Sequence, residues 1–151
     1  MGLIVESRFP PADGGLAVVT LAGELDVASA AELRGHLAAL IGDGAGHLIL
    51  DFARVEFVDS NGLGVLAGVH RLLRSPPRPE TDEHGADGGV LAVAAVNQRV
   101  RQVLRTSGFT RIIPIYPSVE TAIVVHQAGP HHRPAPHHRP AQRDRPAQRD
   151  R

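Results

Sequence analysis

The chain has 151 residues, of which 42% are hydrophobic, and this is enough for one domain with a buried core. It contains no cysteine, which excludes disulfides, thiolate metal sites and cysteine catalysis. The net charge is zero, but residues 127–151 hold six arginines and two aspartates and so carry +4, which leaves −4 on residues 1–126. An acidic domain argues against direct binding of nucleic acid.

The sequence predicts no membrane segment, because none of its apolar runs approaches the length needed to cross a bilayer. Its first residues also lack the basic segment and hydrophobic stretch of a secretory signal. We therefore expect a cytoplasmic protein that does not bind membranes.

Short apolar runs bounded by glycines and polar residues predict the strands, as is typical of buried strands in a sheet. The first run is expected to add an edge strand, and the last is weaker than the others. The predicted strands are Leu3–Phe9, Leu16–Ala22, His47–Phe52, Val90–Val96 and Arg111–Tyr116.

A first helix is predicted after the second strand, where Ser29 and Glu32 have the spacing of a capping box and Ser29 is placed to cap. Gly42 can end this helix. A second helix follows Ser60. Both helices have apolar stripes with the 3.6-residue period, formed by Ala30, Leu33, Leu37, Leu40 and Ile41 in the first and by Val65, Leu66, Val69, Leu72 and Leu73 in the second.

Two more helices continue the alternation of strands and helices. Asn97 can cap a third helix that stops near Gly108, and Ser118 can cap a fourth. This order predicts an α/β fold: a single domain, residues 1–126, with a mixed, mostly parallel sheet and helices packed against it.

Two segments are expected to lie outside the packed core. Residues 75–89 are rich in proline and acidic residues, and we interpret them as a flexible acidic loop within the domain. Residues 127–151 repeat a short pattern of His, Arg, Pro and Ala without large apolar residues, which predicts a disordered tail. Its histidines could bind a metal ion and its arginines an anionic surface, but a solvated tail is the favoured interpretation.

The most informative motif is Asp59-Ser60-Asn61-Gly62, which joins an apolar strand directly to a helical pattern. A hydroxyl and a carboxylate therefore lie at a helix N-terminus, where free N–H groups and the helix dipole favour negative charge. Such a position suits a phosphate, either bound or covalently attached. Ser60 can also act simply as a helix N-cap, and the two roles are compatible.

Gly64 and Gly68 lie four residues apart on a face of the second helix that is separate from its apolar stripe. Each interior glycine costs about 0.5–1 kcal/mol relative to alanine, so the pair needs a reason. Close approach of a partner's backbone and packing against a loop of the same chain explain the pair equally well.

These residues resemble the STAS domain of bacterial anti-sigma factor antagonists. The resemblance rests on Gly23-Glu24-Leu25-Asp26 after the second strand and on the run from Phe57 to Gly68, which contains Asp-Ser-Asn-Gly-Leu-Gly. It continues through Val90–Val96, the arginine-bearing third helix and the turn Ser107-Gly108-Phe109, and it covers roughly residues 3–126.

The resemblance implies a regulatory binding protein that is not an enzyme and has no cofactor. Its unphosphorylated form would bind an anti-sigma factor, usually a serine kinase, and so release a sigma factor. The kinase would phosphorylate Ser60 to end the complex, and a phosphatase would restore it. The partner-binding residues are predicted to be Asp26, Asp59, Ser60, Asn61, Gly62, Gly64 and Gly68.

One position departs from the family pattern. The second hydroxyl residue that the family commonly has is Asn61 here, which cannot be phosphorylated, so Ser60 is the only hydroxyl in the motif. Two alternatives stay open: a STAS module that binds a nucleotide or another anionic small molecule, and an unphosphorylated adaptor in a regulatory complex.

The sequence gives little support for an enzyme. None of the five histidines before the tail forms a His-x-x-x-His spacing, and Ser60 is not in a Gly-x-Ser-x-Gly motif. A phosphate-binding P-loop is also absent from the sequence. The sequence therefore predicts no catalytic residue and no metal site.

Overall fold

The computed structural model describes residues 3–10, 15–74 and 89–128. The predicted tail from residue 129 onward and residues 75–88 of the predicted acidic loop lie outside these described residues. The sheet has five strands in the order β1-β2-β3-β4-β5. β1 runs antiparallel to β2, and the others are parallel to one another. The strands are β1 (Leu3–Arg8), β2 (Leu16–Leu25), β3 (His47–Val58), β4 (Val90–Ala94) and β5 (Ile115–Tyr116).

The last strand is much shorter than predicted, and the expectation of a strand over Arg111–Tyr116 was wrong for its first four residues. Gly108 has a φ of 86°, a left-handed conformation that glycine adopts readily. The chain leaves the third helix at this residue. A 3-10 helix over Phe109–Arg111 follows, and the Ile113 N–H donates to the Phe109 carbonyl at 2.8 Å. Only Ile115 and Tyr116 remain extended beside β4.

The four helices are α1 (Val27–Gly42), α2 (Ser60–Leu73), α3 (Gln98–Thr106) and α4 (Val119–Ala128). The expected caps of the last two are confirmed: Asn97 Oδ1 accepts from the Val100 N–H at 2.7 Å, and Ser118 Oγ accepts from the Thr121 N–H at 3.1 Å. α4 extends two residues beyond the domain boundary expected at residue 126.

The predicted start of α1 was wrong, because Asp26 and not Ser29 is the N-cap. The Asp26 carboxylate accepts from the backbone N–H groups of Ala28 and Ser29, at 3.0 and 3.2 Å. In return, the Ser29 hydroxyl accepts from the Asp26 N–H at 3.1 Å. This is a capping box shifted three residues toward the N-terminus, and it leaves Glu32 exposed on the first turns of the helix.

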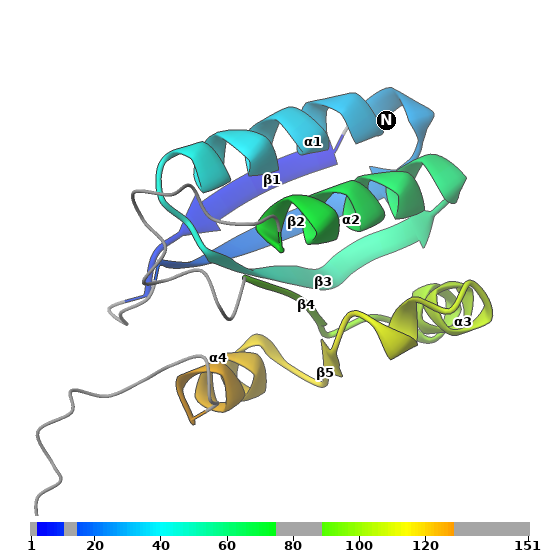
Figure 1. Cartoon of the computed structure of the whole chain (residues 1–151). Helices are drawn as coiled ribbons and strands as arrows, with labels where there is room; N and C mark the ends of the chain where they lie inside the picture. The colour runs from blue at the N-terminus through cyan, green and yellow to red at the C-terminus, as the bar shows by residue number, and fades with distance from the viewer. Residues whose placement is uncertain (1–2, 11–14, 75–88, 129–151) are drawn as a thin grey trace, which may run out of the picture.

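The helices cover both faces of the sheet. Figure 1 shows α1 and α2 side by side on one face, with α4 on the other. α3 adds Val100 and Leu104 to the same core as α1 and α2. That larger core also includes Leu21, Leu33, Leu37, Leu48, Leu50, Phe52, Val65, Leu66 and Leu91.

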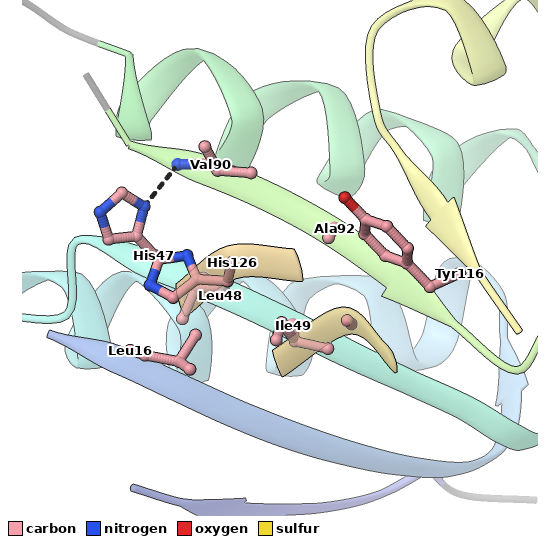
Figure 2. A pocket seen from close by; sticks show the side chains of 9 residues that line it. Leu16, His47, Leu48, Ile49, Val90, Ala92, Tyr116 and His126 are labelled. Atoms are coloured by element: carbon pink, nitrogen blue, oxygen red, sulfur yellow. Dashed lines mark hydrogen bonds between the residues drawn. The ribbon is translucent and has the colours of Figure 1, made fainter. Parts of the chain in front are cut away.

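A smaller core lies between α4 and the sheet, and Figure 2 shows one end of it. The rings of His47 and the buried His126 lie 4.6 Å apart there, and His47 Nδ1 accepts from the Val90 N–H at 3.2 Å. The space between these residues and Tyr116 measures about 20 Å³, which is enough for about one water molecule.

Within the described ranges, no helix is long and apolar enough to cross a membrane.

Candidate functional site

The candidate site lies where β2 and β3 end side by side and lead into α1 and α2. The two strands are parallel, and Leu25 pairs with Val58 at their ends. The Asp59 N–H donates to the Leu25 carbonyl at 3.1 Å, which ties the two strand ends together. The next residues, Asp26 and Asp59, therefore start two neighbouring helices from the same edge of the sheet (Figure 1).

Each of these aspartates caps the helix that follows it. Asp59 Oδ1 accepts from the N–H groups of Asn61 and Gly62 at 2.8 and 3.2 Å, as Asp26 does at the start of α1. Two carboxylates thus occupy two adjacent positive helix ends, where negative charge is stabilised. The structure brings together the two sequence motifs, Gly-Glu-Leu-Asp and Asp-Ser-Asn-Gly, that lie more than 30 residues apart in the chain.

Ser60 is the first residue of α2, and it is exposed. The possible capping role of Ser60 is filled by Asp59, so the hydroxyl is not used to begin the helix. Among the described residues, no hydrogen bond involves this hydroxyl. Ser60 and the exposed Asn61 therefore project from the edge where the two helices start.

Two large apolar side chains lie exposed beside the motif, and the sequence analysis missed both. Val27, next to Asp26, is 68% exposed, and Phe57, two residues before Asp59, is 41% exposed. Val27 is the first residue of α1 and precedes the apolar stripe of that helix. Its exposure could have been predicted from this position if Asp26 had been recognised as the N-cap. Apolar side chains among polar groups are typical of a protein interface.

The three glycines of α2 have different surroundings. Gly62 is buried, and a Cβ at this position would lie 2.6 Å from Leu25 Cγ and 2.9 Å from the Leu25 carbonyl oxygen. Gly62, which the sequence analysis placed among the partner-binding residues, therefore packs internally and lets α2 begin close to the end of β2. Gly64 faces open space, and a Cβ at Gly68 would lie 3.7 Å from Nη1 of Arg34 on α1.

Three observations limit what small ligands and ions the site can take. The N–H groups of Asn61 and Gly62, which could have received an anion, already donate to Asp59. A groove of about 550 Å³ lies nearby. Its lining has one cation, Arg54, and one carboxylate, Glu56, among neutral residues, so its charge does not favour an anionic ligand. In the described part of the chain, no group of three or more His, Asp or Glu side chains is placed to hold a metal ion.

The family model of the STAS domain matches residues 10–76. The chain is 32% identical over 110 residues to an anti-sigma F factor antagonist of Paenibacillus polymyxa, an alignment that covers 72% of this chain and 85% of that protein.

Two solved proteins share the fold. An anti-sigma factor antagonist from Mycobacterium paratuberculosis superposes with a TM-score of 0.64 at 24% identity, over 82% of this chain and 92% of that one. The anti-sigma factor antagonist SpoIIAA in its unphosphorylated form gives a TM-score of 0.62 at 24% identity, over 83% and 98%. SpoIIAA from Bacillus has also been solved in a phosphorylated form, which superposes with a TM-score of 0.56 at 23% identity, over 80% and 97%.

Proposed function

Because the chain belongs to the STAS-domain family of anti-sigma factor antagonists, we propose that it binds an anti-sigma factor of the serine-kinase type and so releases a sigma factor. We place the contact at the docking surface, which we define as Asp26, Val27, Phe57, Asp59, Ser60, Asn61 and the Gly64/Gly68 face of α2. The members of this family are regulators, and the proposed role is binding without catalysis.

The observation that carries this proposal is the junction of the two helix starts. The pairing of β2 with β3, together with the bond from the Asp59 N–H to the Leu25 carbonyl, holds an exposed hydroxyl, two carboxylates and two apolar side chains on rigid elements. Interfaces combine an apolar centre with polar groups that fix the orientation of the partner. Gly64 lets a partner approach the backbone of α2, because no described residue fills the space beside it.

We further propose that phosphorylation of Ser60 switches this contact off and that a phosphatase restores it. A phosphoryl group adds about −1.5 to −2 charges at pH 7 beside the carboxylates of Asp26 and Asp59. The nearest helix amides already donate to Asp59, so they cannot compensate the new charge. The phosphate would therefore keep its water shell and oppose burial of the surface against a partner.

The experiment begins with a tagged copy of the full chain, which should co-purify with a kinase-like anti-sigma factor. Incubation of the pair with ATP should add one phosphate, and Ser60→Ala should abolish this incorporation. Thr106→Ala is the matched control, because it removes an exposed hydroxyl on α3 far along the chain. A phosphate on another residue, or none while the kinase modifies a different substrate, would exclude Ser60 as the acceptor.

The two alternatives receive less support. Binding of an anionic small molecule at the start of α2 would have to displace the Asp59 carboxylate from two N–H groups. An unphosphorylated adaptor would use the same docking surface without the switch, as Asn61 at the second hydroxyl position would allow. Full partner binding after exhaustive treatment with the active kinase favours the adaptor.

A further inference from the structure

Strand β1 is one of the two edge strands of the sheet, and several of its side chains are exposed. Among the described strands it pairs with β2 alone. Ile4 is 62% exposed, and Phe9, the residue that follows the strand, is 63% exposed. The backbone groups along such an edge are a template for pairing with another strand, and proteins that remain monomeric usually block it.

Two charges on this strand are complementary to each other. Glu6 and Arg8 are both exposed and lie two residues apart, so they share one face of β1. Neither forms an ion pair with any residue in the part of the chain that the structure describes. An antiparallel neighbour that placed an arginine opposite Glu6 and a glutamate opposite Arg8 would pair both charges, and β1 itself has this sequence.

We propose that β1 pairs with β1 of a second copy of this chain, antiparallel about a two-fold axis that passes through Ser7. In this register Glu6 lies opposite the partner subunit's Arg8, and Val5 lies opposite the partner subunit's Phe9. Directly opposed residues have Cβ atoms about 4.5–5.5 Å apart on the same face. The symmetry repeats each contact, so the dimer gains two ion pairs and covers both exposed phenylalanines.

The charges select this register over its neighbours. A two-fold axis through Glu6 would place that carboxylate opposite its own copy, and an axis through Arg8 would do the same to the guanidinium group. Like charges directly opposite each other are destabilising, so both of these registers are disfavoured. The axis through Ser7 is the one between them, and it opposes only unlike charges.

The dimer is independent of the proposed function. The docking surface lies at the ends of β2 and β3, whereas the pairing uses the outer side of β1. Two copies joined in this way form one continuous sheet of ten strands and leave both docking surfaces uncovered.

Sedimentation velocity on the full chain, from micromolar to millimolar concentration, tests the proposal. The wild-type protein should pass from monomer to dimer as concentration rises. Glu6→Arg and Arg8→Glu should each shift the equilibrium toward monomer by at least tenfold, and the double charge reversal should restore it. Glu32→Arg is the control, since it reverses an exposed charge on α1. A wild-type monomer at every concentration, or a double variant that stays monomeric, would overturn the proposal.

Cross-linking gives a second readout, because the chain contains no cysteine. Ser7→Cys places a thiol on the proposed axis, where it meets its own copy within the reach of a disulfide. Mild oxidation should therefore give a covalent dimer in high yield. Ile4→Cys lies off the axis and should give little. Equal yields from the two variants would contradict the assigned register.

Discussion

The backbone N–H of Asp59 donates to the carbonyl of Leu25 at 3.1 Å, and this bond extends the pairing of β2 with β3 to the junction of two motifs that are separated by α1. It places the caps of α1 and α2 at neighbouring positions on the same edge of the sheet. Partner binding, in our account, depends on this junction more than on any isolated side chain.

Gly62 is expected to be structural. In Gly62→Ala the new methyl group would lie 2.6 Å from Leu25 Cγ and 2.9 Å from the Leu25 carbonyl oxygen, so α2 or β2 must shift. We expect a loss of about 1–3 kcal/mol in the free energy of unfolding, the usual effect of overpacking a buried position. Urea denaturation measures this free energy. A variant as stable as the wild-type protein would show that the junction can accommodate a methyl group beside Leu25.

Asp59 combines a cap with a charge, and two substitutions separate them. Asn is as good an N-cap as Asp, so Asp59→Asn should retain stability, while Asp59→Ala should cost about 0.5–2 kcal/mol. If the carboxylate contributes to partner recognition, both variants should weaken binding to a similar extent in calorimetry. Unchanged affinity for Asp59→Asn would limit the role of this residue to capping.

Gly64 faces open space, so a longer side chain should fit the folded protein but obstruct a partner. We expect Gly64→Gln to raise the free energy of unfolding by about 0.5–1 kcal/mol, because glycine is the poorer helix former. Partner affinity should fall by about tenfold or more. Gly35→Gln is the matched control, since Gly35 also faces open space but lies on α1 outside the docking surface, and it should not change affinity.

His70 is expected to make stability depend on pH. Burial chiefly, and then the nearby Arg74 and Arg71, lower the pKa of His70 below its ordinary value of 6.5. As pH falls below 6.5, the unfolded chain takes up a proton at this residue before the folded chain does. The free energy of unfolding should therefore decrease as pH falls from 6.5 toward the folded-state pKa, and it should show no such effect above 6.5.

His70→Gln tests that dependence, because it removes the titrating group on α2. The difference in stability between the wild-type protein and the variant should change as pH is lowered below 6.5 and should be constant at higher pH. Melting temperatures measured from pH 5 to pH 8 follow it directly. A constant difference over the whole range would show that this histidine titrates alike in both states.

The sequence predicted much of the fold because the signals were local and periodic. The apolar stripes of α1 and α2 lie in or against the core as expected, except that Leu72 of α2 is 45% exposed, and Asn97 caps α3. Two errors came from backbone geometry that composition does not reveal. Asp26 and Ser29 are both favourable N-cap residues, and the structure uses Asp26. The left-handed conformation of Gly108 leads the chain into a 3-10 helix where a strand was expected.

The candidate site was only partly predictable for a related reason. The resemblance identified Asp26, Asp59 and Ser60, but their neighbourhood depends on the pairing of Leu25 with Val58 across 33 residues of chain. Phe57 is exposed because it lies near the end of β3, where no other element in the described part of the chain buries it. The alternation of polar and apolar residues in the sequence does not reveal this. The burial of Gly62 likewise could not be predicted without knowing that Leu25 of the adjacent strand packs against it.

The most direct test of the account is the affinity of the co-purified anti-sigma factor for this chain before and after stoichiometric phosphorylation at Ser60. Calorimetry should give one tight site for the unphosphorylated protein. Phosphorylation should weaken it by about a hundredfold or more, because like charges within an interface cost several kcal/mol. Ser60→Asp should reproduce only part of this loss, since one carboxylate carries less charge than a phosphate. Equal affinity of the two forms would contradict the switch, and absence of binding by the unphosphorylated protein would contradict the docking surface itself.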